Sequence, residues 1–320
     1  MLNRLLDTAI EATVVGSFTR IGPAVRSRLD GWEPVDVDLT DTAILVTGGS
    51  SGLGRETARR LVGLGATVHL TSRSATRARG VAEELNDGGP GTAIGHALDT
   101  GELDSVDELV GAVTEQLDGA GLDVLLHNAG ALTDRHETNS AGLEQTLASH
   151  LVGPYALTLG LRPHLSPGAR VLWMSSGGMY TQGLDVDRLE MRPERYQGSV
   201  AYARAKRAQV ELVTHLAPRL APDVILHALH PGWVDTPGVD SSLPGFGRVM
   251  GPLLRDVEDG ADTAVWLAAG GASGWKPGLF WLDRRPRSTA YLPGTSTTES
   301  ERGRLVEWLD ARVGSERVSS

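Results

Sequence analysis

The chain contains no cysteine, which excludes disulfides, thiolate metal ligands and cysteine nucleophiles. No apolar run approaches the ~20 residues that a bilayer-spanning helix needs. The first residues do not resemble a signal peptide, because Asp7 and Glu11 interrupt the stretch where an uncharged apolar core would lie. The net charge of −10 disfavours a nucleic-acid partner, and the nine histidines form no His-Glu-x-x-His metal pattern. These absences predict a cytoplasmic protein with no metal site.

Lysine is also scarce. Of the 30 basic residues only Lys206 and Lys276 are lysines, and the rest are arginines. An arginine guanidinium does not release its proton in proteins, whereas a lysine ammonium does so when its surroundings change. Because the chain otherwise uses arginine for positive charge, Lys206 is a candidate for a chemical role.

From residue 43 onward, strand-like runs alternate with helical patterns. The predicted strands are 43–46, 66–70, 92–98, 122–126, 169–174, 224–229 and 278–282. This alternation predicts an α/β fold, a doubly wound parallel sheet of the Rossmann type with helices on both faces. Since the composition does not change along the chain, we expect one catalytic domain at 41–290. A partly helical N-terminal extension at 1–40 and a helical tail at 291–320 flank it.

A glycine-rich turn follows the first predicted strand and precedes a helical pattern. Its members are Thr47, Gly48, Gly49, Ser50, Ser51, Gly52, Leu53 and Gly54. Glycine permits a tight turn and lets backbone N–H groups approach a pyrophosphate, and a helix N-terminus adds further donors. The turn therefore predicts a dinucleotide site, although glycine and serine also fill ordinary loops.

The second predicted strand leads into Ser72 and Arg73, and this segment holds no acidic residue. An acid there would bind the ribose 2′-hydroxyl of NAD, whereas Arg73 offers a planar fork to a 2′-phosphate. The segment predicts NADP(H) over NAD(H), unless Arg73 is only a surface arginine at a helix start. Asp99 follows the third predicted strand, where it either binds the edge of the adenine ring or caps the next helix.

Tyr202 and Lys206 lie four residues apart in a helical pattern, so they share one helix face. A lysine ammonium near a phenol favours phenolate, which lowers the phenol pKa and makes it a usable proton donor or acceptor. The fifth predicted strand leads into Ser175 and Ser176, and a serine there can donate to a carbonyl oxygen or serve only the turn.

With these motifs in order, residues 40–290 resemble the short-chain dehydrogenase/reductase superfamily, single-domain type. The matching motifs are Thr47-Gly48-x-x-x-Gly52-x-Gly54, His127-Asn128-Ala129-Gly130, Ser176, Tyr202-x-x-x-Lys206 and His230-Pro231-Gly232. Segments around them, including Trp233-Val234-Asp235-Thr236, look most like the member-12 dehydrogenase/reductase subgroup, which also carries an N-terminal extension.

The resemblance implies an NADP(H)-dependent oxidoreductase that transfers a hydride between nicotinamide and a carbonyl/alcohol pair. It implies that Tyr202 is the general acid/base, that Ser176 positions the carbonyl oxygen and that Lys206 holds the ribose hydroxyls. Further cofactor contacts are implied for Asn128, Ala129, Gly130, Tyr202, Pro231, Gly232, Val234 and Thr236. The alternative is a non-catalytic NADP(H)-binding sensor or scaffold of the same fold.

One position departs from the family pattern. The family's fourth catalytic residue is an asparagine three residues before a glycine, and alignment on Gly153 puts His150 there. An imidazole can hold a relay water as asparagine does, because it both donates and accepts. The other interpretation is a helix histidine packed against the sheet.

Three segments bear on substrate and partners. Apolar residues in 179–198 and 237–255 predict either a lid over a small, apolar carbonyl or alcohol substrate, or ordinary loop anchors. They include Tyr180, Leu184, Met191, Tyr196, Leu243, Phe246, Met250 and Leu254.

One face of a predicted N-terminal helix is apolar and consists of Leu2, Leu5, Leu6, Ala9, Ile10 and Val14. This helix packs on the domain or on a second subunit, or residues 1–30 make peripheral contact with a membrane. By analogy with related enzymes we expect a homo-oligomer.

Overall fold

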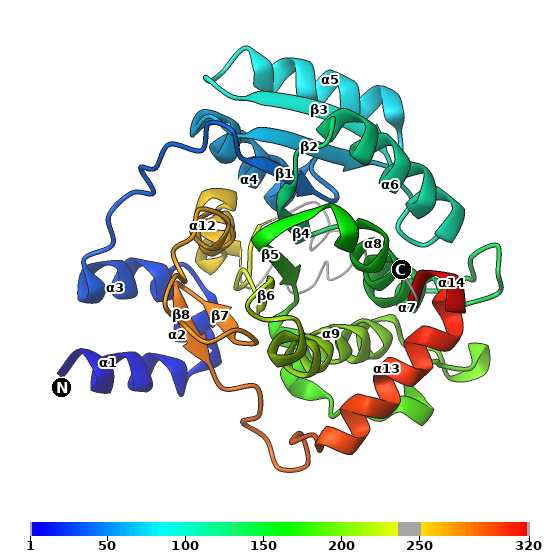
Figure 1. Cartoon of the computed structure of the whole chain (residues 1–320). Coiled ribbons are helices and arrows are strands. Elements are labelled where there is room, and N and C mark those ends of the chain that lie inside the picture. Colours follow the sequence, from blue (N-terminus) through cyan, green and yellow to red (C-terminus); the bar gives the residue numbers. More distant parts are fainter. Residues whose placement is uncertain (1, 131, 236–250, 319–320) are drawn as a thin grey trace.

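A central sheet of eight strands organises the protein, whose computed structural model describes residues 2–130, 132–235 and 251–318 (Figure 1). The strands are β1 (Ala43–Val46), β2 (Thr67–Ser72), β3 (Thr92–Ala97), β4 (Leu122–His127), β5 (Leu165–Met174), β6 (Val224–Leu229), β7 (Phe280–Leu282) and β8 (Arg285–Arg287). Their order is β3-β2-β1-β4-β5-β6-β7-β8. The seven predicted strands are confirmed, with β5 beginning earlier than predicted.

The predicted doubly wound parallel sheet is confirmed, with one added antiparallel strand at its edge. β8 pairs antiparallel with β7, while the other neighbouring strands pair parallel. Its sequence is Arg-Pro-Arg, so it has no apolar run by which to predict a strand. The turn before it uses Asp283 and Arg284 at φ 53° and 52°, where a glycine would have signalled a hairpin.

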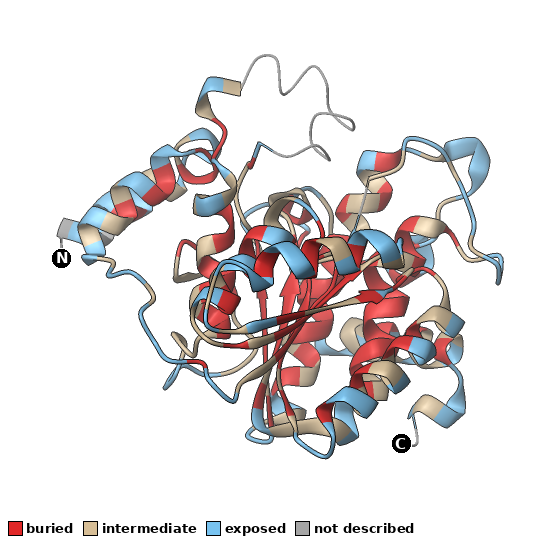
Figure 2. Cartoon of the chain, turned by 90° about the horizontal axis from the view of Figure 1, so that it is seen from above, coloured by how far each residue is buried: buried red, intermediate tan, exposed pale blue. Residues whose placement is uncertain are grey.

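Helices cover both faces of the sheet. One face carries α4 (Gly52–Gly63), α5 (Ala75–Asn86) and α12 (Val257–Ala268), and the other carries α6 (Leu103–Leu117), α8 (Gly153–Leu161) and α9 (Gly198–Leu220). Successive strand residues point to opposite faces, so Leu125 belongs to the α6–α8–α9 core and Leu126 to the other. Figure 2 shows the buried strands between helices whose outer sides are exposed.

The strand register brings the functional segments to one edge of the sheet. Val46 pairs with Leu126, His127 with Trp173, and Met174 with Leu229. Because the strands are parallel, the turns after β1, β4, β5 and β6 all begin at this carboxyl edge. Ligands bind at this edge in open α/β sheets.

The N-terminal extension forms α1 (Leu2–Glu11), α2 (Val14–Phe18) and α3 (Ile21–Asp30), which lie beside β7 and β8 (Figure 1). It packs on the domain, but in an unexpected orientation. Leu5 is 63% exposed, whereas Asp7 is only 8% exposed and binds Arg26, Arg285 and Arg287. The acidic side of α1 therefore faces the protein, and the leucine side faces outward.

The C-terminal tail forms α13 (Glu299–Val313) and the short α14 (Ser315–Val318). Thr298 and Glu301 form a capping box at the start of α13, which supplies hydrogen bonds to its first N–H groups. Leu305, Leu309 and Val313 are buried against α8 and α9. The tail thus completes the core on that side, and the division of the chain at residues 40 and 290 stays a prediction.

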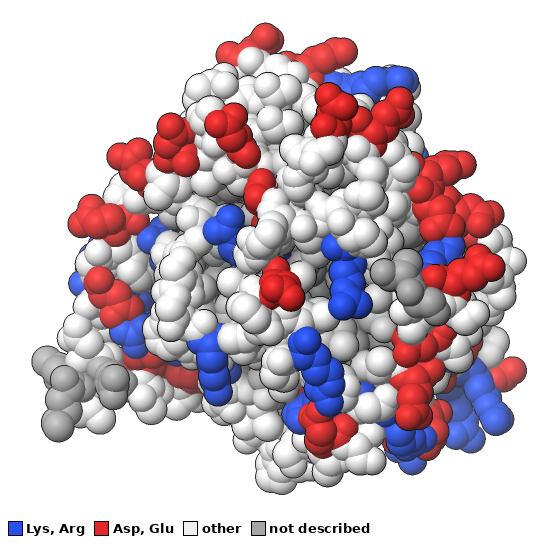
Figure 3. Space-filling model, in the orientation of Figure 1, with Lys and Arg blue, Asp and Glu red and all other residues white. Residues whose placement is uncertain are grey.

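On the face drawn in Figure 3, acidic groups gather along the upper, left-hand and right-hand edges, and Lys and Arg groups lie nearer the centre and at the lower right. Among the helices that the structure describes, none is long and apolar enough to cross a bilayer. Within the same residue ranges, no three His, Asp or Glu side chains are grouped as a metal site would require.

Candidate active site

The glycine-rich turn between β1 and α4 is fastened to two neighbouring strands. The Thr47 hydroxyl accepts the N–H groups of Asn128 and Ala129, each at 3.0 Å. The Asn128 amide donates back to the Thr47 carbonyl at 2.9 Å, and the Gly48 N–H donates to the Thr71 hydroxyl at 3.0 Å. Thr47, Asn128 and Ala129 therefore hold the turn in place from within the fold.

The shape of this turn fits a dinucleotide phosphate. Gly48 has φ 67°, and a Cβ on Gly54 would overlap the Gly48 carbonyl and the Asn128 amide. Ser51 precedes α4 without a side-chain cap, so the first N–H groups of the helix, from Gly52 and Leu53, are not capped by it. Free N–H donors at a helix N-terminus can bind a pyrophosphate, and the neighbouring glycines have no side chain that would block its approach. Ser50, in the same turn, is buried.

The predicted adenosine contacts occupy the adjacent strand ends. Arg73 is exposed directly after β2 and, within the described ranges, makes no ion pair. The Ser72 hydroxyl accepts the N–H of Ser74, which caps α5. The Asp99 carboxylate accepts the Gly101 N–H at 2.9 Å in the turn before α6, but it does not cap that helix, whose N-cap residue is Glu102.

Helix α9 brings Tyr202 and Lys206 to the turn after β5. The Lys206 ammonium donates to the Met174 carbonyl at 2.7 Å and lies 5.5 Å from the centre of the Tyr202 ring. The Ser176 hydroxyl lies close enough to the Tyr202 phenol to lower its pKa, and it accepts the Gly178 N–H at 3.2 Å. Ser175 instead donates to the Lys206 carbonyl at 2.9 Å, which makes it structural. The serine, tyrosine and lysine of the predicted set therefore meet.

Burial controls the protonation of this pair. It lowers the pKa of Lys206 from 10.5 to about 7. It raises the pKa of Tyr202, and the nearby Ser176 hydroxyl acts in the opposite direction. The expectation that Lys206 lowers the Tyr202 pKa is not met here, because the ammonium is itself desolvated and points to the Met174 carbonyl. Both groups are thus biased toward their neutral forms.

His150 also lies beside the tyrosine. It belongs to a π-helical turn, Ala148–Val152, between α7 (Gln145–Leu147) and α8. Its ring meets the Tyr202 ring edge-on with centres 5.2 Å apart, and the Gln209 amide donates to its backbone carbonyl at 2.5 Å. The ring lies so close to Gly130 that a Cβ there would overlap it. Single π-turns inside helices often occur at functional sites.

The turn after β6 is held by residues that sequence reasoning missed. Pro231 and Gly232 are partly buried and Val234 is buried, while Thr236 lies outside the described residues. The Trp233 N–H donates to the carbonyl of Phe18 in the N-terminal extension at 2.7 Å. No short sequence pattern links Phe18 to Trp233, because they lie so far apart in the chain. The only signal for this contact in the sequence is the amphipathic character of the N-terminal extension, which indicates that it packs against something.

The lid interpretation is wrong for the described part of the first loop. Met179, Tyr180 and Leu184 are buried in the core, and the Tyr196 hydroxyl binds Thr133 and Thr146, so these side chains anchor the loop. Met191 is partly buried. In the second loop Leu254 is buried, whereas the predicted residues Leu243, Phe246 and Met250 lie outside the described residues.

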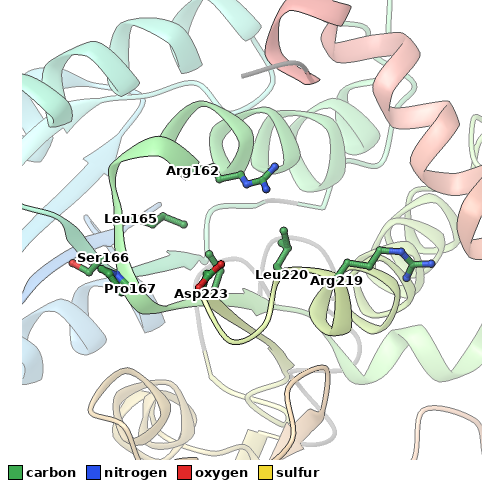
Figure 4. Close-up of a pocket in the computed structure, with 8 residues that line it drawn as sticks. Arg162, Leu165, Ser166, Pro167, Arg219, Leu220 and Asp223 are labelled. Atoms are coloured by element: carbon green, nitrogen blue, oxygen red, sulfur yellow. The ribbon is translucent and has the colours of Figure 1, made fainter.

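A cavity of about 240 Å³ lies away from this site (Figure 4). Its lining includes Leu165 and Val224, the first residues of β5 and β6, with Arg162 and Arg219 beside them. Ser176 lies beyond the opposite end of β5, so the cavity and the catalytic residues occupy opposite edges of the sheet. The cavity is therefore separate from the site that contains Ser176 and Tyr202.

The fold and this set of residues define a class of proteins. A family model described as short chain dehydrogenase matches residues 42–244, and the chain belongs to this family. The protein is therefore a hydride-transfer oxidoreductase of a family that binds a nicotinamide cofactor.

Individual relatives agree with this assignment. The chain is 38% identical to "Dehydrogenase/reductase SDR family member 12" of Bos taurus, over 87% of this chain and 88% of that protein. It is 26% identical to a solved short chain dehydrogenase from Burkholderia cenocepacia J2315 in complex with NADP, with TM-score 0.59, covering 72% of this chain and 91% of that chain. It is also 26% identical to the reductase LugOII, which catalyses keto-reduction at C1 during lugdunomycin biosynthesis, with TM-score 0.63, covering 76% and 96%.

Replacing Lys206 with methionine should change how stability depends on pH. The folded protein holds the Lys206 pKa at about 7, whereas the unfolded chain titrates near 10.5. Between these values unfolding takes up a proton, so the free energy of unfolding of the unmodified protein should rise relative to Lys206→Met as pH increases from about 7 to about 10. Denaturant titrations without cofactor at several pH values measure this difference.

Lys276 is exposed and gives the matched control. Lys276→Met should keep the pH dependence of the unmodified protein. A difference between Lys206→Met and the unmodified protein that stays constant over this pH range would contradict a lowered Lys206 pKa.

Proposed function

We propose that the protein is an NADP(H)-dependent oxidoreductase that interconverts a small, apolar carbonyl compound and its alcohol. The observation that carries the proposal is the meeting of Ser176, Tyr202 and Lys206 at the same sheet edge as the glycine-rich turn. The nicotinamide cofactor, when bound, supplies or takes up the hydride.

Each residue has a role that follows from its chemistry. Burial keeps the Tyr202 phenol protonated, which is the form that donates a proton to the oxygen of a carbonyl being reduced. The Ser176 hydroxyl lies close to that phenol, so both hydroxyls can be directed at one substrate oxygen and stabilise the charge that develops there. The Lys206 ammonium, held by the Met174 carbonyl, would donate to the ribose hydroxyls. The turn containing Gly48, Gly52 and Gly54 would hold the pyrophosphate.

A non-catalytic NADP(H)-binding sensor or scaffold is the alternative function. It predicts tight cofactor binding with no turnover of any carbonyl substrate. The complete set of Ser176, Tyr202 and Lys206 counts against it, because a site that only binds the cofactor does not require the Ser176 and Tyr202 hydroxyls beside each other. A screen of carbonyl compounds that follows NADPH absorbance separates the two functions.

Tyr202→Phe tests the assignment of the proton donor. The substitution removes the phenolic proton and keeps the ring that packs against His150. We expect near-normal NADPH binding and turnover reduced at least about a hundredfold, the scale of a lost general acid. Steady-state kinetics and a cofactor titration measure the two effects. Turnover close to that of the unmodified enzyme would show that another group donates the proton.

Arg73→Ala tests the cofactor preference. Arg73 is exposed after β2 with no acid at the strand end, so the unmodified protein should bind NADPH more tightly than NADH. The substitution should weaken this preference by roughly 1–3 kcal/mol, the scale of a charge-assisted contact. Fluorescence titrations with both cofactors provide the measurement, and Arg77→Ala, an exposed arginine one helical turn further on, serves as the control. Equal affinities in the unmodified protein would contradict the proposal.

His150 is proposed to hold the relay water in place of the family's asparagine. Its ring contacts Tyr202, and either an imidazole or an amide can donate to and accept from a water. His150→Asn should therefore keep most of the turnover, whereas His150→Leu should lose it while cofactor binding and the circular dichroism spectrum stay unchanged. Equal turnover in both variants would mean that His150 is only a packed helix residue.

The remaining partner and location assignments stay predictions. Peripheral membrane contact through residues 1–30 is supported by the outward face of the extension, where Leu5, Val14 and Val15 are exposed. Flotation with anionic vesicles tests this contact. We also propose that the protein forms a homo-oligomer, which light scattering tests, and that it is cytoplasmic.

A further inference from the structure

Phe18, at the end of α2, lies among residues of the catalytic edge. Its ring is 7% exposed and meets the rings of His230 and Trp233 edge-on, with centres 4.7 Å and 5.7 Å apart. A Cβ on Gly177 would overlap the Phe18 ring, so the ring rests directly on the residue that follows Ser176. One side chain from the N-terminal extension thus contacts the turn after β5 and the turn after β6.

The backbone of the same residue reinforces this contact. The Phe18 carbonyl accepts the Trp233 N–H at 2.7 Å and the Arg255 Nε–H at 3.0 Å. The Arg255 backbone N–H in turn donates to the Trp233 carbonyl at 2.8 Å. The turn after β6 is therefore held between the extension on one side and Arg255 on the other.

A buried set of charges determines where Phe18 lies. The side chains of Arg26 and Arg255 are fully buried and both bind Asp283, each at 2.5 Å. Both guanidinium groups also donate to the Ser17 carbonyl, at 3.3 Å from Arg26 and 2.7 Å from Arg255. Because the carbonyls of residues 17 and 18 satisfy these guanidinium groups, moving Phe18 would leave buried donors unpaired.

From this geometry we propose that Phe18 is a positioning residue for the reaction. It fixes the Ser176–Gly177 turn, which would direct the substrate oxygen, relative to the Pro231–Val234 turn, which would face the nicotinamide. The inference rests on the proposed function. Hydride transfer needs the donor and acceptor carbons in one narrow arrangement, so a shift between these two turns lowers the rate even when all reacting groups are present.

The experiment compares Phe18→Ala and Phe18→Leu with the unmodified protein. Alanine removes the ring, whereas leucine keeps an apolar side chain between the two turns. For Phe18→Ala we expect kcat to fall about 10- to 100-fold, the scale of a small misplacement. Binding of 2′,5′-ADP, which carries only the adenosine half of NADP, should be unchanged, because Phe18 supports the turns after β5 and β6. Phe18→Leu should recover most of the lost kcat.

Leu109→Ala is the matched control for lost stability. Leu109 is buried in the same core, on α6, which packs mainly against α8 and β3. At a temperature where both alanine variants are folded by circular dichroism, only Phe18→Ala should lose kcat. Equal kcat values in the two alanine variants would overturn the inference. It would also be overturned if Phe18→Ala lost 2′,5′-ADP binding as strongly as it lost kcat, because that result indicates general unfolding.

The proposed function can fail separately. If the unmodified protein binds NADPH but turns over no carbonyl substrate, the oxidoreductase proposal fails in its catalytic part. If it turns over substrate and Phe18→Ala behaves like Leu109→Ala, only the positioning role of Phe18 fails.

Discussion

The carboxylate of Asp283 lies between the guanidinium groups of Arg26 and Arg255, 2.5 Å from each, and all three side chains are buried. Burial by itself would raise the pKa of Asp283, but the two arginines hold it below its usual range, so the group is ionised. Such a set is favourable only when complete, because each charge left without its partner would be very costly in the interior. Since Arg26 belongs to α3 and Arg255 precedes α12, these charges join the extension to the catalytic domain.

The need to pair buried charges also explains two features that the hydrophobic pattern of the sequence does not predict. Arg285 and Arg287 of β8 bind Asp7 at 2.7 Å and 2.8 Å, so a strand without apolar residues still pairs at the sheet edge. Asp7 must face the protein to make these contacts, and the helix α1 is thereby rotated until Leu5 faces outward. Several charge-assisted hydrogen bonds at once outweigh the burial of individual leucines.

At the catalytic edge of the sheet, exclusion of solvent changes the properties of all the polar groups. It biases Lys206 and Tyr202 toward their neutral forms, and it strengthens each hydrogen bond directed at a reacting oxygen. This environment exists only because the extension, the turn after β6 and helix α9 pack around the same point. The N-terminal extension is therefore part of the catalytic end of the molecule, in contact with the residues beside Ser176 and Trp233.

The sequence alone determined the α/β class, seven of the eight strands, the glycine-rich turn, the Tyr202–Lys206 pair and the family, because each depends on a short-range period or spacing. It did not reveal β8, the inward face of α1 or the contact of Phe18 with Gly177. It also gave the wrong direction for the Tyr202 pKa. These features depend on contacts between distant segments, such as Arg26 and Asp283, which are 257 positions apart. Burial and the pairing of buried charges decided them, and both arise only when the whole chain has folded.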